Sequence, residues 1–186
     1  MRACSGSHHR LIIVATRLAL EDGADESLIA WFLANGADPN ARYEMDMTPL
    51  SIAVQFAPLP IIETLFAHSK PPFHGQLLHH AARRTSSSDC KAVIELVLQR
   101  CGRSQINDIM YQNHAFSFEI RKCVGFGTAL YEAARYGTPQ AVRVLLDHGA
   151  DASVRGTCGR TALEVAEKAG NRVVVDLLSV GLRGAG

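Results

Sequence analysis

The chain has 186 residues and a formal net charge of +1, with 19 basic and 18 acidic side chains. Hydrophobic residues make up 47% and charged residues 20%, which is typical of a globular protein and excludes a wholly disordered or collagen-like chain. The near-zero net charge argues against non-specific nucleic-acid binding. The excess of 15 arginines over 4 lysines has two explanations, recognition of carboxylate or phosphate groups and a high-GC coding sequence.

Membrane insertion and metal binding find little support in the sequence. No apolar run has the length of a membrane span, and LIIVAT, which begins at Leu11, is too short for a secretion signal. The five cysteines form no CxxC pair and lack zinc-ligand spacing. We therefore expect reduced thiols, no metal and no cofactor, in a cytoplasmic or nuclear protein.

A segment that begins at Thr128 is repeated from Thr161. TALYEAARYGTPQAVRVLLDHGADAS and TALEVAEKAGNRVVVDLLSVG align with an offset of 33 residues, and a third copy, TPLSIAVQFAPLPIIETLFAHS, starts at Thr48. Each threonine is placed to accept backbone hydrogen bonds at a helix start, and glycines such as Gly149 and Gly170 follow where helices end. Each unit therefore predicts two short helices joined by a turn.

These motifs resemble the ankyrin repeat. Its pattern is a Thr-Pro-Leu-His opening, a glycine turn, a Val-Val-x-Leu-Leu-Leu helix and Gly-Ala-Asp before a finger, here NGADPNA and HGADASV. The resemblance covers about five units, which we place at residues 9–42, 43–75, 76–102, 123–155 and 156–181, with an insertion at 103–122. It implies an all-α solenoid of stacked helix-turn-helix pairs with short β-hairpin fingers, in a single domain of residues 1–186.

Departures from the pattern occur along the whole chain. Unit one lacks the opening motif and is expected to cap the array. Unit three keeps the motif histidine, His79, expected to hydrogen-bond a neighbouring loop, and its turn RTSSSD leads to Asp89, predicted to cap the next helix. In unit five Val173 replaces an acidic residue, so this end is expected to pack under the tail 182–186 or to form a weak dimer.

The largest departure lies between units three and four. Cys101 and Gly149 hold the same repeat position 48 residues apart, so 48 − 33 = 15 residues are extra. Within AFSFEIRK, Phe116, Phe118 and Ile120 alternate with polar residues, which is strand periodicity. We expect an extended hairpin or lid beside the groove; the alternative is that both phenylalanines pack down on neighbouring fingers.

Ankyrin-like arrays bind partners in a concave groove lined by first helices and finger tips, and the resemblance implies the same here. Four arginines occupy successive positions that the repeat alignment places in the groove. We call them the arginine ladder: Arg83, Arg84, Arg135 and Arg160. Arginines beside aromatic residues are typical of interface hot spots. The predicted partner-binding residues are Tyr43, Glu44, Met47, Phe56, Arg83, Arg84, Phe116, Phe118, Arg121, Phe126, Arg135, Tyr136 and Arg160. Further register positions are Met45, Gln55, Thr157, Cys158, Glu167 and Lys168.

No catalytic motif is present: the sequence lacks GxSxG, a P-loop, HExxH and a dinucleotide fingerprint. If the chain is nevertheless an enzyme, its acid–base groups are expected to be His114, Asp108, His80, Glu132 and Tyr136.

Two hypotheses about function remain. The first is a stand-alone module that binds an acidic, partly apolar protein or peptide. The alternative is a small-molecule-binding or catalytic protein that acts on an anionic, partly apolar molecule, with the insertion as lid. An open groove favours the first and an enclosed pocket the second. Neither nucleic acid nor a membrane is expected as a partner.

Overall fold

The computed structural model describes residues 26–84, 89–136 and 138–183. The chain forms two compact units, Met1–Leu77 and Leu78–Gly186. The first half of predicted unit one, most of the RTSSSD turn, the tail beyond residue 183 and the side chain of Glu44 lie outside the described residues. The repeat boundaries and the single domain remain predictions.

The first compact unit holds α2 (Glu26–Ala34), η1 (Glu44–Asp46), α3 (Pro49–Phe56) and α4 (Leu59–Ala67). Helix α3 begins where the sequence predicts, because Thr48 Oγ1 accepts from the Ser51 amide at 3.0 Å and Ser51 Oγ accepts from the Thr48 amide at 3.0 Å. Helices α3 and α4 pack together, with Leu50 and Ile62 fully buried. This unit therefore contains one complete helix pair.

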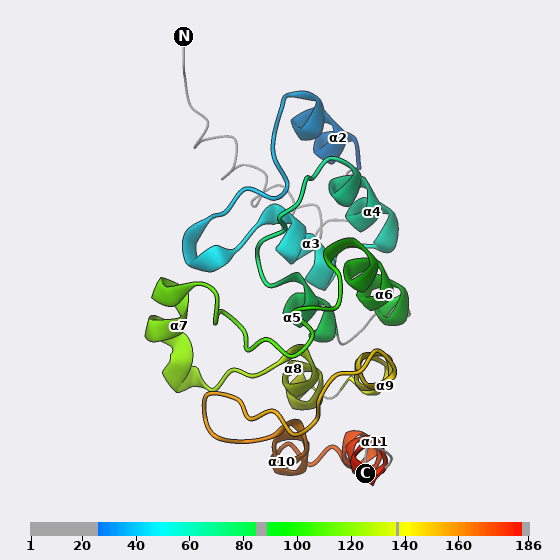
Figure 1. The fold of residues 1–186 in the computed structure, drawn as a ribbon. Helices are drawn as coiled ribbons and strands as arrows, with labels where there is room; N and C mark the ends of the chain where they lie inside the picture. Colours follow the sequence, from blue (N-terminus) through cyan, green and yellow to red (C-terminus); the bar gives the residue numbers. More distant parts are fainter. Residues whose placement is uncertain (1–25, 85–88, 137, 184–186) are drawn as a thin grey trace. The chain divides into compact units, whose positions relative to one another are not determined.

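The second compact unit contains three further helix pairs (Figure 1). Its elements are α5 (Leu77–Ala82), α6 (Cys90–Cys101), α7 (Ala115–Arg121), η2 (Lys122–Val124), α8 (Ala129–Tyr136), α9 (Pro139–Asp147), α10 (Ala162–Lys168) and α11 (Arg172–Arg183). Helix α8 packs on α9 and α10, while α9 packs on α6 and α11. In Figure 1, α5, α8 and α10 form one column and α6, α9 and α11 a second. Leu130, Leu145 and Leu178 are fully buried between them.

The predicted caps at Thr48, Thr128 and Thr161 and the predicted glycine turns at Gly149 and Gly170 are confirmed. Thr161 Oγ1 accepts from the Glu164 amide at 3.3 Å, and Glu164 Oε2 accepts from the Thr161 amide at 2.9 Å. Gly149 and Gly170 have φ of 88° and 69°, the left-handed conformation that glycine tolerates. No described residue belongs to a strand, so the predicted hairpin fingers are turns, closed by bonds such as Gly156 N to Arg160 O at 2.9 Å.

Two local predictions are wrong. Asp89 makes no side-chain capping bond to α6, because its carboxylate pairs with Arg84 at 2.8 Å. The AFSFEIR segment is helix α7 and not a strand. The His114 side chain accepts from the Ser117 amide at 3.3 Å and starts the helix, so Phe116 and Phe118 point to different sides of it.

The base of the insertion is fixed to the helix pairs. Met110, Tyr111 and Phe126 form a buried cluster on which Phe118 packs. The Met110 amide donates to Gly127 O at 2.9 Å, which closes the insertion at its base. Packing of Phe118 agrees with the alternative of a downward-facing side chain, whereas Phe116 is 66% exposed.

The motif histidine has the role that the sequence predicts. His79 Nε2 lies 3.0 Å from Asp108 O, at the start of the insertion. His79 and its neighbour His80 are both buried. Burial, chiefly, lowers the pKa of His79 to about 4 and the pKa of His80 to about 3, and the charge of Arg83 lowers both further. Both side chains are therefore neutral in the folded protein at pH 7, and Nε2–H of His79 donates to the carbonyl.

We expect acid to destabilise the protein through these two histidines. Their folded-state pKa lies below the unfolded value of about 6.5, so unfolding takes up protons and stability falls as pH drops from 6.5 toward 4. Each histidine should remove about 1.4 kcal/mol between pH 7.5 and pH 5.5. Urea unfolding at both pH values measures this loss. His80→Gln should lose less stability between the two pH values than the wild type; an equal loss would contradict the assignment.

Helix α11, the last described helix, carries exposed apolar side chains. Val173 is 55% exposed and Val180 is 68% exposed. The weak dimer through this surface remains a prediction. Among the described residues, no helix is both long enough and apolar enough to cross a membrane.

Candidate functional site, a cationic cleft

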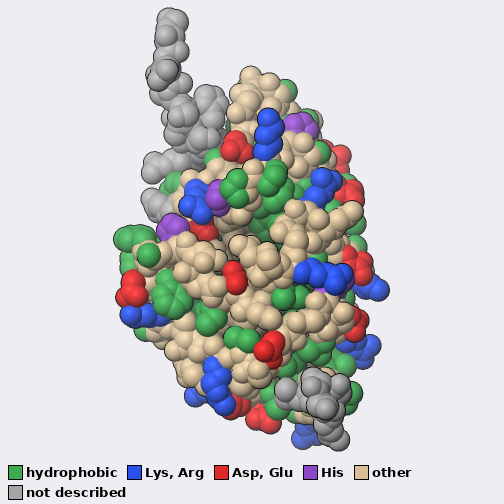
Figure 2. Space-filling view, viewed as in Figure 1, with side chains coloured by type: hydrophobic (Ala, Val, Ile, Leu, Met, Phe, Trp, Pro, Cys, Tyr) green, Lys and Arg blue, Asp and Glu red, His purple; other side chains and the backbone are tan. Residues whose placement is uncertain are grey.

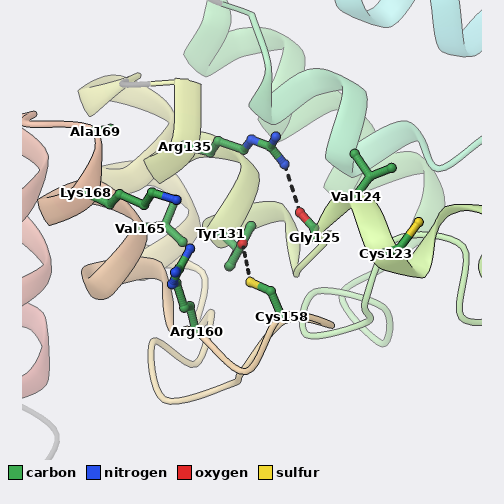
Figure 3. Close-up of a pocket in the computed structure, with 10 residues that line it drawn as sticks. All are labelled: Cys123, Val124, Gly125, Tyr131, Arg135, Cys158, Arg160, Val165, Lys168 and Ala169. Atoms are coloured by element: carbon green, nitrogen blue, oxygen red, sulfur yellow. Dashed lines mark hydrogen bonds between the residues drawn. The ribbon is translucent and has the colours of Figure 1, made fainter.

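A cleft of about 450 Å³ opens on the side of the second compact unit that carries the first helices and the finger (Figure 3). Its walls come from η2, α8, α10 and the loop of residues 148–161 between α9 and α10, which we call the finger. The lining residues are Cys123, Val124, Gly125, Tyr131, Arg135, Cys158, Arg160, Val165, Lys168 and Ala169. Seven of these ten residues are exposed, so the cleft is open to solvent.

Three cations from three elements line the cleft: Arg135 of α8, Arg160 of the finger and Lys168 of α10. Within the described ranges none of them takes part in an ion pair, and no aspartate or glutamate lines the cleft. Arg135 Nη1 donates to Gly125 O at 2.8 Å, which fixes the direction of that side chain. Figure 3 shows Arg160 and Lys168 extending toward each other beside Val165. The cleft is therefore suited to an anionic group.

Helix α7 and η2 place an apolar stripe beside this charge. Phe116, Ile120 and Val124 are 66%, 55% and 56% exposed; the four-residue spacing puts Phe116 and Ile120 on one side of α7, and Val124 follows in η2. Val124 belongs both to the stripe and to the cleft wall. Figure 2 shows hydrophobic side chains at the left edge of the molecule, where Figure 1 places α7. We use the name apolar stripe for these three residues.

The cleft also contains a perturbed thiol. Cys158 Sγ and the Tyr131 hydroxyl lie 3.1 Å apart. Partial burial acts to raise the pKa of Cys158, but the hydrogen bond with Tyr131 and the backbone and charge of Arg160 together bring that pKa below its ordinary value. Burial instead raises the pKa of Cys90, and it raises the pKa of Cys101 to about 11. The Cys158 thiol is therefore more reactive than the thiols of Cys90 and Cys101.

We expect iodoacetamide to alkylate Cys158 severalfold faster than Cys90 or Cys101 at pH 7.5, because the thiolate is the nucleophile. Mass spectrometry of peptides from a time course measures the three rates. Tyr131→Phe removes the hydrogen bond and should slow Cys158 while leaving Cys90 unchanged. Equal rates at the three cysteines, or no effect of Tyr131→Phe, would contradict the environment described for Cys158.

Two arginines of the predicted ladder are engaged inside the protein. Arg83 donates through Nε and Nη2 to Glu132 Oε2 at 3.1 and 3.0 Å, and Glu132 has no exposed side-chain surface. Arg84 is buried and pairs with Asp89. Only Arg135 and Arg160 of the ladder line the cleft. The sequence missed the pairing because Glu132 is 49 residues from Arg83 along the chain.

The predicted aromatic residues divide between surface and core. Phe116 is exposed on α7, whereas Phe126 is buried and Phe118 packs against its cluster. Tyr136 is 47% exposed, with the Arg83 guanidinium 5.4 Å from its ring centre. Arg121 lies over the ring of Tyr111 at 5.7 Å. The insertion is thus held by packing of Phe118 and Arg121 on the buried cluster that contains Tyr111 and Phe126.

The remaining predicted residues lie elsewhere. Tyr43, Met47 and Phe56 belong to the first compact unit, where the Tyr43 amide donates to Met47 O at 2.7 Å and Phe56 is 60% exposed. None of the five groups predicted for an enzyme lines the cleft. His114 caps α7 and Glu132 is held by Arg83. In the part of the chain that the structure describes, no three His, Cys, Asp or Glu side chains form a metal-binding group.

Seven residues of the cleft and the apolar stripe are absent from both the predicted binding residues and the further register positions: Ile120, Cys123, Val124, Gly125, Tyr131, Val165 and Ala169. Tyr131 and Cys123 carry no signal in the repeat pattern, because the first is read as a helix residue and the second falls in the insertion. Ile120 and Val124 could have been found, since they follow Phe116 at successive four-residue intervals, a helical signal that competes with the strand signal.

The stacked helix pairs define a helical repeat protein. The family model described as Ankyrin repeats, in three copies, matches residues 78–183, which is more than half of the chain. The chain therefore belongs to the ankyrin repeat family, as its motifs indicate, and ankyrin repeats are generally protein–protein interaction modules. No curated protein matches the chain.

Proposed function

We propose that this chain is a protein-binding module that holds an acidic, partly apolar segment of its partner in the cationic cleft and along the apolar stripe. The observation that carries the proposal is the continuity of the two surfaces. Arg135, Arg160 and Lys168 line one cleft whose wall has no acidic side chain, and Val124 of the same wall lies next in the stripe to Ile120 of α7.

The charge and the exposed apolar area have complementary roles in this proposal. Cations of a groove attract an acidic segment and fix its position, whereas apolar side chains supply the buried area that stabilises the complex. Three large exposed hydrophobic residues on one short segment are costly in water unless a partner covers them. The two features together favour a partner in which acidic residues follow apolar ones.

The openness of the cleft favours a protein over a small molecule. Exposed residues form most of its wall, and pockets for small molecules usually bury most of the ligand surface. A groove of this kind suits an extended segment that runs from the cleft to the stripe. The free thiols Cys123 and Cys158 support a reducing compartment, cytoplasm or nucleus, as the place of action.

A selection of random peptides displayed on phage, with the full chain as bait, tests the proposal. We expect the recovered peptides to share acidic residues next to apolar ones. Binding measured by fluorescence anisotropy should weaken at least tenfold, about 1.4 kcal/mol, in Arg160→Ala and in Ile120→Ser. Arg143→Ala is the matched control, because Arg143 is exposed on α9 and does not line the cleft.

Melting curves of the variants separate binding from folding, since Arg160 and Ile120 are exposed and should change stability little. Recovered peptides that lack acidic residues, or that bind Arg160→Ala and wild type equally, would contradict the proposal.

A further inference from the structure

We propose that the anionic group held by the cleft is a phosphorylated side chain of the partner segment, so that phosphorylation of the partner controls binding. This inference rests on the proposed function and names the chemistry of the group that the cleft recognises.

The balance of charge in the cleft favours a dianion. Arg135, Arg160 and Lys168 bring three positive charges into a space of about 450 Å³ whose wall has no carboxylate. One partner carboxylate would leave two of these charges unmatched. A phosphoryl group has a charge of about −1.5 to −2 at pH 7, so it offsets more of their mutual repulsion.

Acidic side chains near the cleft do not supply this charge. Glu164 of α10 interacts electrostatically with Arg160, but its carboxylate accepts from the Thr161 amide at 2.9 Å and from Arg155 at 3.2 Å. Glu132 of α8 is turned to Arg83 and has no exposed surface. Glu167 of α10 is exposed and does not line the cleft.

The geometry of the donors matches a phosphoryl group as well. Its three terminal oxygens accept from several directions, whereas a carboxylate accepts in one plane. The three cations come from three elements, α8, the finger and α10; Arg160 and Lys168 extend toward each other, and Arg135 extends toward Gly125 (Figure 3). Arg135 is fixed by Gly125 O through Nη1, which leaves its other nitrogens for a ligand. Arginine clusters of this kind recognise phosphorylated segments in other folds.

Three peptide libraries with identical random flanks and a fixed central phosphoserine, glutamate or serine test the inference on the full chain. We expect the phosphoserine peptides to bind at least tenfold more tightly than their glutamate counterparts, and the glutamate peptides more tightly than the serine ones. In Arg160→Gln and Lys168→Gln the advantage of phosphoserine over glutamate should fall toward one. Arg143→Gln should retain it.

Dependence on pH supplies a second readout. The second pKa of a phosphoryl group is about 6, so the advantage of phosphoserine should shrink as pH falls from 7.5 to 5. Besides Arg135, Arg160 and Lys168, the ionisable groups that line the cleft are Cys123, Cys158 and Tyr131. The measurement is made with Cys158→Ser, which removes the thiol of lowered pKa from the cleft.

Each outcome bears on one of the two proposals. Glutamate and phosphoserine peptides that bind equally would overturn the phosphoryl assignment and leave the acidic-segment proposal standing. Serine peptides that bind as well as both would overturn the two together. Inorganic phosphate that competes at millimolar concentration supports the assignment to the cleft, whereas an advantage of phosphoserine that persists in both glutamine variants places the phosphoryl group elsewhere.

Discussion

Replacement of Arg83 by methionine should destabilise the protein by about 3–5 kcal/mol. The reason is the carboxylate of Glu132, which has no exposed surface and receives both Nε–H and Nη2–H of Arg83. Methionine fills much of the same volume but leaves a buried charge without its cation. Urea unfolding of wild type and Arg83→Met, followed by circular dichroism, measures the loss.

A double variant separates the charge from the packing. In Arg83→Met with Glu132→Gln the buried charge is gone, and the glutamine oxygen still accepts from the Gly127 amide, which lies 3.4 Å from Glu132 Oε1. We expect the double variant to recover most of the lost stability. If Arg83→Met alone unfolds at the same urea concentration as wild type, Arg83 is a surface residue and its place in the predicted binding ladder becomes tenable again.

The second large effect is expected at Leu145. Leu145 of α9 is fully buried, and α9 packs on α6, α8 and α11. Leu145→Ala should cost about 2–5 kcal/mol, the range for a leucine removed from a core that relaxes only partly. Val180→Ala on α11 is the control, because Val180 is 68% exposed and should change stability by less than about 0.5 kcal/mol.

The place of Leu145 in the array explains why its effect should be large. Each repeat is stabilised by its neighbours, so a cavity in α9 weakens its packing on both α6 and α11. An unchanged unfolding midpoint for Leu145→Ala would show that these helices do not share a core.

The repeat signal predicts the fold well because its residues act locally. Thr48 and Thr161 cap the helices that directly follow them, and Gly149 and Gly170 end helices through their own backbone. Such signals need only a few neighbouring residues, and three copies of them reinforce one another. The same reasoning placed Arg135 and Arg160 on the groove side, and both line the cleft.

The insertion shows where sequence reasoning fails. Alternation of Phe116, Phe118 and Ile120 is compatible with a strand, and the cap that decides for a helix is the side chain of His114, which is an unusual helix-starting residue. The fate of Arg83 is set by Glu132, a contact between α8 and the residue that follows α5. No local sequence pattern predicts a contact of this kind. Only two of the four arginines of the ladder therefore line the cleft.

The role of Cys158 and Tyr131 likewise depends on a tertiary contact. Their side chains meet across 27 residues of sequence, between α8 and the finger. The repeat pattern gives neither residue a special role. The contact between the finger and α8 helps to lower the pKa of the Cys158 thiol.

A charge-reversal exchange tests most directly that the cleft binds an acidic segment. The most frequent peptide from the phage selection is made in two forms, with its acidic residue or with lysine in that place, and both are titrated against wild type and Arg160→Glu. We expect Arg160→Glu to bind the acidic form at least tenfold more weakly than wild type does. It should bind the lysine form more tightly than wild type does. Equal preference of the two proteins for the acidic form would contradict the cleft as the binding site.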